Sequence, residues 1–239
     1  MTNIIHGSLP VHGGEWAALC EEKASQVRDA CRVRHFLPGE PVYYEGDQPA
    51  GIYCLTKGLV GIRKSDAEGD SVLLRLVRPG QTFGYRALLM NEPHGVSAEA
   101  LKASRVCQVP AATVSRLMAE DPSLITAFFR YLARDMEEAE NKVMEAMTAS
   151  SRVRFLRLLL LLCVDGRDGE CEGGSGGEIH LELPVSRQDI ASLIGVRSET
   201  MSRVIRGIED EGLAHFSGRR VEIPDPHRLA EESAGALAA

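Results

Sequence analysis

The fold is decided by residues 183 to 223, which read LPVSRQDIASLIGVRSETMSRVIRGIEDEGLAHFSGRRVEI. Ser186 followed three residues later by Asp189 predicts a capped helix start, and Gly195 predicts the end of that helix. A second helix is predicted after the glycine turn, because apolar residues recur there at helical spacing. These residues are Met201, Val204, Ile205 and Ile208. Two short helices joined by a glycine-bearing turn are typical of a helix-turn-helix.

The free face of the second predicted helix carries the side chains that major-groove reading requires. An arginine can donate to a guanine edge, and a glutamate can accept from a cytosine amino group. We therefore expect Arg203 and Glu199, one helical turn apart, to read neighbouring base pairs. Ser202 is expected to approach a thymine methyl group or an adenine edge.

A hairpin with a basic tip is predicted after the second helix. Gly212 ends the helix, and two short apolar segments then flank the turn at Ser217, Gly218 and Arg219. Such a hairpin is the wing of a winged helix-turn-helix, which we place in residues 151–239. The residues expected to contact the DNA backbone are Ser186, Arg187, Ser198, Arg206, Arg219 and Arg220.

Upstream, residues 33 to 110 are interrupted by glycine or proline about every 8 to 12 residues. The intervening runs are rich in β-forming residues, notably 41–44, 51–55, 59–64 and 71–77. Short strands at this interval predict an antiparallel β-roll, preceded by a small helix over 14–30. We assign residues 1–118 to this N-terminal domain, so the chain as a whole is predicted to be α+β.

Residues 119–150 between these domains are predicted to form a long helix with a narrow apolar stripe. Apolar positions alternate four and three residues apart from Ile125 as far as Ser150, and charged residues fall elsewhere. One interpretation is a helix that lies against its own domain. We favour a parallel homodimer instead, whose predicted interface comprises Ile125, Phe129, Leu132, Met136 and Val143.

Composition limits the other classes of function. The formal net charge is −7, and the segment 186–220 holds six arginines against five acidic residues, so spacing rather than charge indicates DNA. No apolar run approaches the roughly 18 residues of a membrane span, and the N-terminus lacks the features of a signal peptide. A cytoplasmic protein with six reduced cysteines is therefore expected. Enzymatic activity is not expected, because the sequence lacks HExxH and GxxxxGK[ST].

The segment SRQDIASLIGVRSETMSRVIRGIEDEGL, residues 186 to 213, resembles the helix-turn-helix of the CRP/FNR superfamily of bacterial regulators. The resemblance extends more loosely through the roll and covers residues 33 to 223. It implies that Glu199 and Arg203 contact bases. Ser202 stands where FNR-type members carry a serine, and Ser198 where CRP-type members carry an arginine, which implies a TTGAT-type palindrome. Arg197 replaces the usual Ser or Thr cap, so the helix starts either there or, if Ser198 caps it, one residue later.

The same resemblance bears on the signal. In members that bind cyclic AMP, a Gly-Glu pair holds the ribose and an Arg-Ser-Ala run holds the phosphate. This chain has Gly84-Tyr85 and Val96-Ser97-Ala98 at those places. Because the arginine is missing and an unpaired buried anion is costly, cyclic AMP is not the expected ligand. The candidate sensor pocket is Tyr85, Arg86 and Ser97, with Arg86 either an anion partner or paired with an acid.

The identity of the signal stays open: a small molecule, a redox change or a gas. A haem through His35 or His94 is one alternative, although both are interpreted as solvated loop residues. An iron–sulfur cluster or a Cys20–Cys31 redox pair are others, but no CxxC exists. Cys54, Cys107 and Cys163 are expected to be buried small hydrophobes. Alternative functions are a cyclic-nucleotide-responsive regulator or a module that acts on a protein partner; an activator would also contact RNA polymerase.

Overall fold

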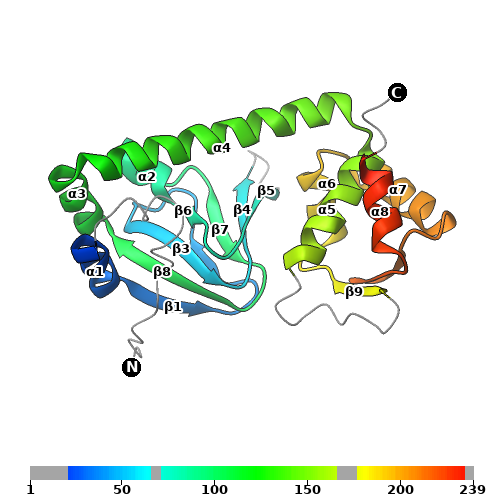
Figure 1. Cartoon of the computed structure of the whole chain (residues 1–239), viewed down its shortest axis with the longest axis horizontal. Coiled ribbons are helices and arrows are strands. Elements are labelled where there is room, and N and C mark those ends of the chain that lie inside the picture. The colour runs from blue at the N-terminus through cyan, green and yellow to red at the C-terminus, as the bar shows by residue number, and fades with distance from the viewer. Residues whose placement is uncertain (1–20, 66–70, 166–176, 235–239) are drawn as a thin grey trace. The chain divides into compact units, whose positions relative to one another are not determined.

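The computed structural model describes residues 21–65, 71–165 and 177–234. The chain divides into two compact units, residues 1–138 and 139–239, and each is described by itself. Figure 1 shows a strand-rich first unit and a mainly helical second unit. The predicted α+β class, with an N-terminal antiparallel roll and a C-terminal helix-turn-helix, is confirmed.

The first unit contains two four-stranded antiparallel sheets (Figure 1). The first sheet has the order β1 (Arg32–Phe36), β8 (Ser104–Pro110), β3 (Gly51–Lys57) and β6 (Thr82–Phe83). The second has the order β2 (Pro41–Tyr43), β7 (Ser97–Ala100), β4 (Val60–Ser65) and β5 (Ser71–Val77). A core of aliphatic and aromatic side chains, among them Tyr43, Tyr53 and Phe83, fills the roll.

Two glycines allow close approaches between the strands of the roll. A Cβ on Gly51 would lie 2.0 Å from the carbonyl oxygen of Val109, and one on Gly58 would lie 2.5 Å from that of Ala103. Neither approach leaves room for a side chain, so the turns and pairings beside β8 depend on glycine at these positions.

A second core lies where helices cover the first sheet. The helices of this unit are α1 (Glu21–Ala30), α2 (Tyr85–Met90), α3 (Ala111–Glu120) and the beginning of α4 (Pro122–Thr148). Val27, Val114, Leu117 and Phe128 are buried together with residues of β3 and β8. The predicted helix over 14–30 is confirmed from residue 21, and its first part lies outside the described residues.

The long helix within 119–150 begins at Pro122, where Asp121-Pro122 predicts a helix start, and ends at Thr148, earlier than expected. Asp121 interrupts the helix, because its carboxylate accepts hydrogen bonds from the N–H (3.0 Å) and the hydroxyl (2.6 Å) of Ser123 and Pro122 opens a new first turn. At the other end Ser150 lies beyond α4, where its Oγ accepts from the N–H of Val153 at the start of the next helix. Ser150 is therefore not part of the stripe.

The second unit contains five elements of the predicted winged helix-turn-helix and two flanking helices. They are α5 (Ser151–Asp165), β9 (Ile179–Glu182), α6 (Arg187–Leu193), α7 (Ser198–Asp210), β10 (His215–Ser217), β11 (Arg220–Ile223) and α8 (Pro226–Ala234). The sheet has the order β10-β11-β9, and α8 packs on α5. The glycine-rich stretch 165–177, interpreted from sequence as a surface loop, lies largely outside the described residues.

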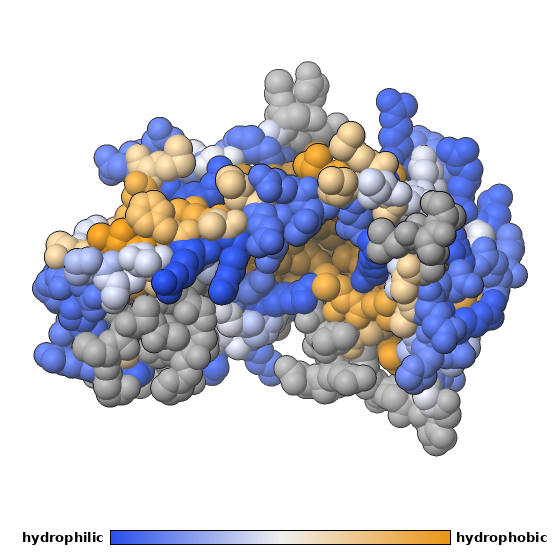
Figure 2. Space-filling view, turned by 45° about the horizontal axis from the view of Figure 1, so that its top comes forward, coloured by the Kyte–Doolittle hydropathy of each residue, from blue (hydrophilic) through white to orange (hydrophobic). Residues whose placement is uncertain are grey.

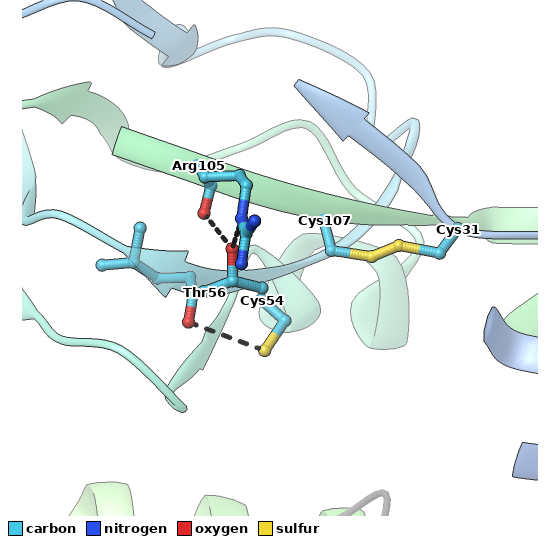
Figure 3. Close-up of a disulfide and its surroundings, with 6 residues drawn as sticks. Cys31, Cys54, Thr56, Arg105 and Cys107 are labelled. Carbon is cyan, nitrogen blue, oxygen red and sulfur yellow. Dashed lines mark hydrogen bonds between the residues drawn. A yellow bond between two sulfur atoms is a disulfide. The ribbon is translucent and has the colours of Figure 1, made fainter. Parts of the chain in front are cut away.

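A disulfide links Cys31, just after α1, to Cys107 in β8 (Figure 3). The expectation that both are thiols is therefore wrong. Cys31 precedes β1 by one residue, and Val33 in that strand pairs with Cys107, which places the two Cα atoms 5.9 Å apart. Cys54 and Cys163 are buried, as predicted, whereas Cys20 and Cys171 lie outside the described residues.

Within the described ranges, no helix is both long and apolar enough to cross a membrane.

Candidate nucleic-acid interface

The predicted capping box opens α6. Ser186 Oγ accepts from the N–H of Asp189 at 3.1 Å, and the Asp189 carboxylate accepts from the N–H of Ser186 at 3.2 Å. The helix ends at a turn in which Gly195 has a φ of +67°, a conformation that favours glycine. Reciprocal capping at one end and a glycine turn at the other fix the direction in which the chain enters α7.

The start of α7 settles the question of its cap. Arg197 is extended and its carbonyl accepts from the N–H of Met201 at 3.0 Å, so Arg197 is the N-cap and Ser198 is the first helical residue. The alternative in which Ser198 caps the helix is wrong. Arg197 makes no side-chain cap, which leaves the first N–H groups of α7 without a side-chain acceptor from this residue.

The two faces of α7 divide as the sequence predicts. Met201, Ile205 and Ile208 are buried, whereas Glu199, Ser202, Arg203 and Arg206 are exposed on the opposite face. Ser202 Oγ donates to the carbonyl of Ser198 at 3.0 Å, and the guanidinium of Arg203 lies 3.5 Å from Thr200 Oγ1. The candidate base-reading side chains are thus brought together on one exposed face, near the N-terminal end of the helix.

The wing is attached to both α5 and α7. The N–H of Phe216 in β10 donates to Glu209 of α7 at 3.0 Å, and the ring of Phe216 stacks on Phe155 of α5 with centroids 5.8 Å apart. Arg219 and Arg220 are exposed at the tip, beside Gly218 in a left-handed conformation. The wing hairpin therefore has a fixed position relative to the exposed face of α7.

The other residues that are predicted to contact the DNA backbone are also exposed or partly exposed. Arg187 and Ser198 are exposed, and Ser186 is partly buried because its hydroxyl serves the cap. Their contact with DNA stays a prediction.

The three candidate sensor residues differ in their exposure and in the residues that they contact. Tyr85 is buried, and its hydroxyl donates to the carboxylate of Asp135 in α4. Ser97 Oγ accepts from the N–H of Glu45 at 2.9 Å. Arg86 is exposed on α2 and forms no ion pair with any described residue. Pairing of Arg86 with an acid is therefore not observed, and the pocket that these residues would form stays a prediction.

Sequence reasoning missed the contacts between the roll and α4. Asp135 accepts from Arg75 of β5 at 2.7 Å as well as from Tyr85, and the hydroxyl of Tyr131 donates to the carbonyl of Thr82 at 2.9 Å. These pairs join residues about 50 to 60 positions apart in the chain, so no local pattern could indicate them.

The interpretation of His94 as a solvated loop residue is wrong. Only 3% of His94 is exposed, and its ring stacks on Tyr43 with centroids 3.7 Å apart. Burial lowers the pKa of His94, although the nearby carboxylate of Asp47 opposes this shift. Burial likewise raises the pKa of the Tyr43 hydroxyl. His35, in contrast, is exposed on β1.

Comparison with known proteins assigns both parts of the chain. Residues 33–121 match the family model described as a cyclic nucleotide-binding domain, and residues 153–232 match the Crp-like helix-turn-helix domain. The nitrogen fixation regulation protein FixK of Bradyrhizobium diazoefficiens is 27% identical over 195 residues, which are 82% of this chain and 79% of the relative. The cyclic AMP receptor protein of Thermus thermophilus is 27% identical over 231 residues, 96% of this chain and 98% of the relative.

Solved structures agree with this assignment. A transcriptional regulator of the CRP/FNR family from Thermus thermophilus superposes with a TM-score of 0.69 at 25% identity, over 84% of this chain and 98% of the other. A CRP/FNR regulator from Eubacterium rectale superposes with a TM-score of 0.73 at 17% identity over 94% and 98%, which supports the fold alone.

The fold and the interface define a transcription regulator that combines an effector-binding domain of the cyclic-nucleotide type with a DNA-binding helix-turn-helix. The chain belongs to the CRP/FNR family.

Proposed function

We propose that the chain acts as a homodimer that reads a TTGAT-type palindrome and changes its DNA affinity when the roll receives a small-molecule, redox or gas signal. One observation carries the proposal: Glu199, Ser202 and Arg203 lie together on the exposed face of α7, which the capped α6 and the wing hold in place. Paired reading helices about one helical turn of DNA apart would contact two half-sites.

The outer face of α4 supports the dimer. Leu124 and Phe128 face the core of the roll, whereas Phe129, Met136 and Val143 are exposed, and Figure 2 shows apolar side chains at the surface along α4. Leu132 is half-buried and also packs against the roll. An exposed apolar stripe at coiled-coil spacing is stabilised when it meets its own copy.

The contacts of Asp135 connect the roll to this apolar stripe, so a structural change in the roll would reach the stripe through them. Asp135 holds Arg75 and Tyr85 and is followed directly by Met136, which lies in the predicted interface. A ligand that moves α2 or β5 would therefore change the packing of the paired helices. Ser97 and Arg86 remain the candidate ligand contacts in the roll, and the missing arginine beside Ser97 still disfavours cyclic AMP.

Specific reading is tested by replacing the two candidate base contacts. Glu199→Ala and Arg203→Ala are each expected to weaken binding to the selected palindrome by about 1 to 3 kcal/mol and to relax the preference at one base pair of each half-site. The site is first obtained by selection from random duplexes, and affinities are then measured by fluorescence anisotropy. Arg228→Ala, which removes an exposed arginine from α8, serves as the control. An equal loss on selected and random DNA would contradict the base-reading role.

The wing is expected to behave differently. Because Arg219 lies at the exposed tip of the hairpin, Arg219→Ala should weaken binding to selected and random DNA by the same factor. The slope of log K against log salt concentration should become shallower by about 1 for each subunit. A change in base preference with an unchanged salt slope would instead assign Arg219 to base reading.

A further inference from the structure

Arg154 differs from the other arginines of α5. Arg152 binds the carboxylates of Glu211 and Glu232, and Arg157 binds Glu145 at 2.6 Å and the carbonyl of Ser233 at 3.2 Å. The guanidinium of Arg154, by contrast, has neither an ion pair nor a hydrogen bond to the part of the chain that the structure describes. Its Nε is nevertheless buried. A buried donor without an acceptor is unusual, because the lost hydration is then not replaced.

The guanidinium of Arg154 lies at the turn between α6 and α7. Its Nη1 is 3.5 Å from the position that a Cβ on Gly195 would occupy. Two residues further along the chain, Arg197 caps α7 without a side-chain hydrogen bond to the helix. Arg154 therefore lies beside the turn that leads into α7, whose first turns carry Glu199 and Ser202.

When a helix enters the major groove by its N-terminal end, the phosphates on the groove edge lie beside that end and the turn before it. A guanidinium offers five donors and matches the geometry of a phosphate. We propose that Arg154 donates to a DNA phosphate beside the turn at Gly195, as a contact that fixes the depth and register of α7. This inference rests on the proposed DNA-reading function and adds a contact from a helix outside the helix-turn-helix.

The small net charge of residues 186–220 supports the proposed contact between Arg154 and a phosphate. Residues 186–220 carry six arginines and five acidic residues, so the reading segment itself is about neutral. Of the arginines on α5, Arg152 and Arg157 are already neutralised by carboxylates. Arg154 is therefore the guanidinium of this helix whose charge is available to a phosphate.

The salt dependence of binding tests the inference. Arg154→Met keeps most of the length of the side chain but removes its charge and donors. We expect it to weaken binding to selected and random DNA by the same factor, and to make the slope of log K against log salt shallower by about 1 for each subunit. Arg154→Lys keeps the charge without the planar fork, so it should retain the salt slope. Arg228→Met, which removes one exposed positive charge from α8, is the control.

The outcomes separate the possible failures. If the unsubstituted chain selects no DNA sequence, the proposed function fails, and this inference fails with it. If the unsubstituted chain binds its site but Arg154→Met leaves the salt slope unchanged, only the contact of Arg154 is refuted. Should Arg154→Met fold poorly, as judged by its thermal midpoint, Arg154→Gln decides, because it removes the charge but keeps a polar side chain. A salt slope shallower by about 1 for each subunit supports the contact, and an unchanged slope refutes it.

Discussion

Replacing Phe129 and Val143 together by glutamate is expected to give a monomer that has lost specific DNA binding. Both side chains are exposed on the stripe of α4, Phe129 to 66% and Val143 to 62%. Four negative charges would then meet along the paired helices, where burial of a charge is strongly unfavourable. Because a dimer holds two reading helices on one site, loss of pairing should weaken binding to the palindrome by roughly 10²- to 10⁴-fold.

A matched control is available on the same helix. Met144 is 61% exposed but lies beside the stripe, so Met144→Glu with Asn141→Glu adds the same charge at positions outside the predicted interface. This control is expected to stay dimeric by analytical ultracentrifugation and to keep its affinity. If the stripe variant sediments as a dimer, or if both pairs of substitutions act alike, the interface does not run along these residues.

Reduction of the Cys31–Cys107 disulfide is expected to lower the free energy of unfolding of the roll by about 2 to 4 kcal/mol. The bond closes a loop across 76 positions and fixes the end of α1 to the central part of the first sheet. The separation of 5.9 Å between the Cα atoms lies within the range usual for disulfides. Urea unfolding followed by circular dichroism, with and without a phosphine reductant, measures the loss.

The urea unfolding experiment needs a constant protein concentration and a control variant. The protein concentration is held constant, because the proposed dimer would also stabilise the folded chain. The Cys31→Ala variant cannot form the bond, so its unfolding midpoint should be low and independent of the reductant. Equal midpoints for the unsubstituted chain in both conditions would mean that Cys31 and Cys107 are not paired. Cys54, whose thiol donates to the carbonyl of Leu55, the next residue of β3 (Figure 3), is not expected to respond.

The features that sequence analysis predicted correctly are those set by residues close in the chain. The capping box joins Ser186 and Asp189, three positions apart, and the buried face of α7 follows from the spacing of Met201, Ile205 and Ile208. Glycine at 195 and 218 likewise marks a turn by its own backbone preference. Such local signals do not depend on how distant strands align, so they were sufficient to predict which face of α7 is exposed.

The features that were missed depend on distant alignment. His94 follows Pro93 in what reads as a turn, but its N–H donates to the carbonyl of Asp47 at 2.8 Å, which holds the ring against Tyr43. The pairing of Cys31 with Cys107 requires the register of β1 and β8. The cap of α7 was ambiguous for a different reason: the choice between Arg197 and Ser198 depends on where α6 ends and how the turn at Gly195 closes.

The pairing of β9 with β11, together with the packing of α8 on α5, brings the last described helix back beside α5, the first helix that lies wholly in the second unit. Polypeptide segments whose entrance and exit lie together can be exchanged between proteins with little disturbance to their interior. Recombination that supplies a different receptor upstream would therefore leave the wing and its reading helix intact. A chimeric protein that joins this second unit to a different sensor domain should therefore bind the same DNA site in response to a different signal.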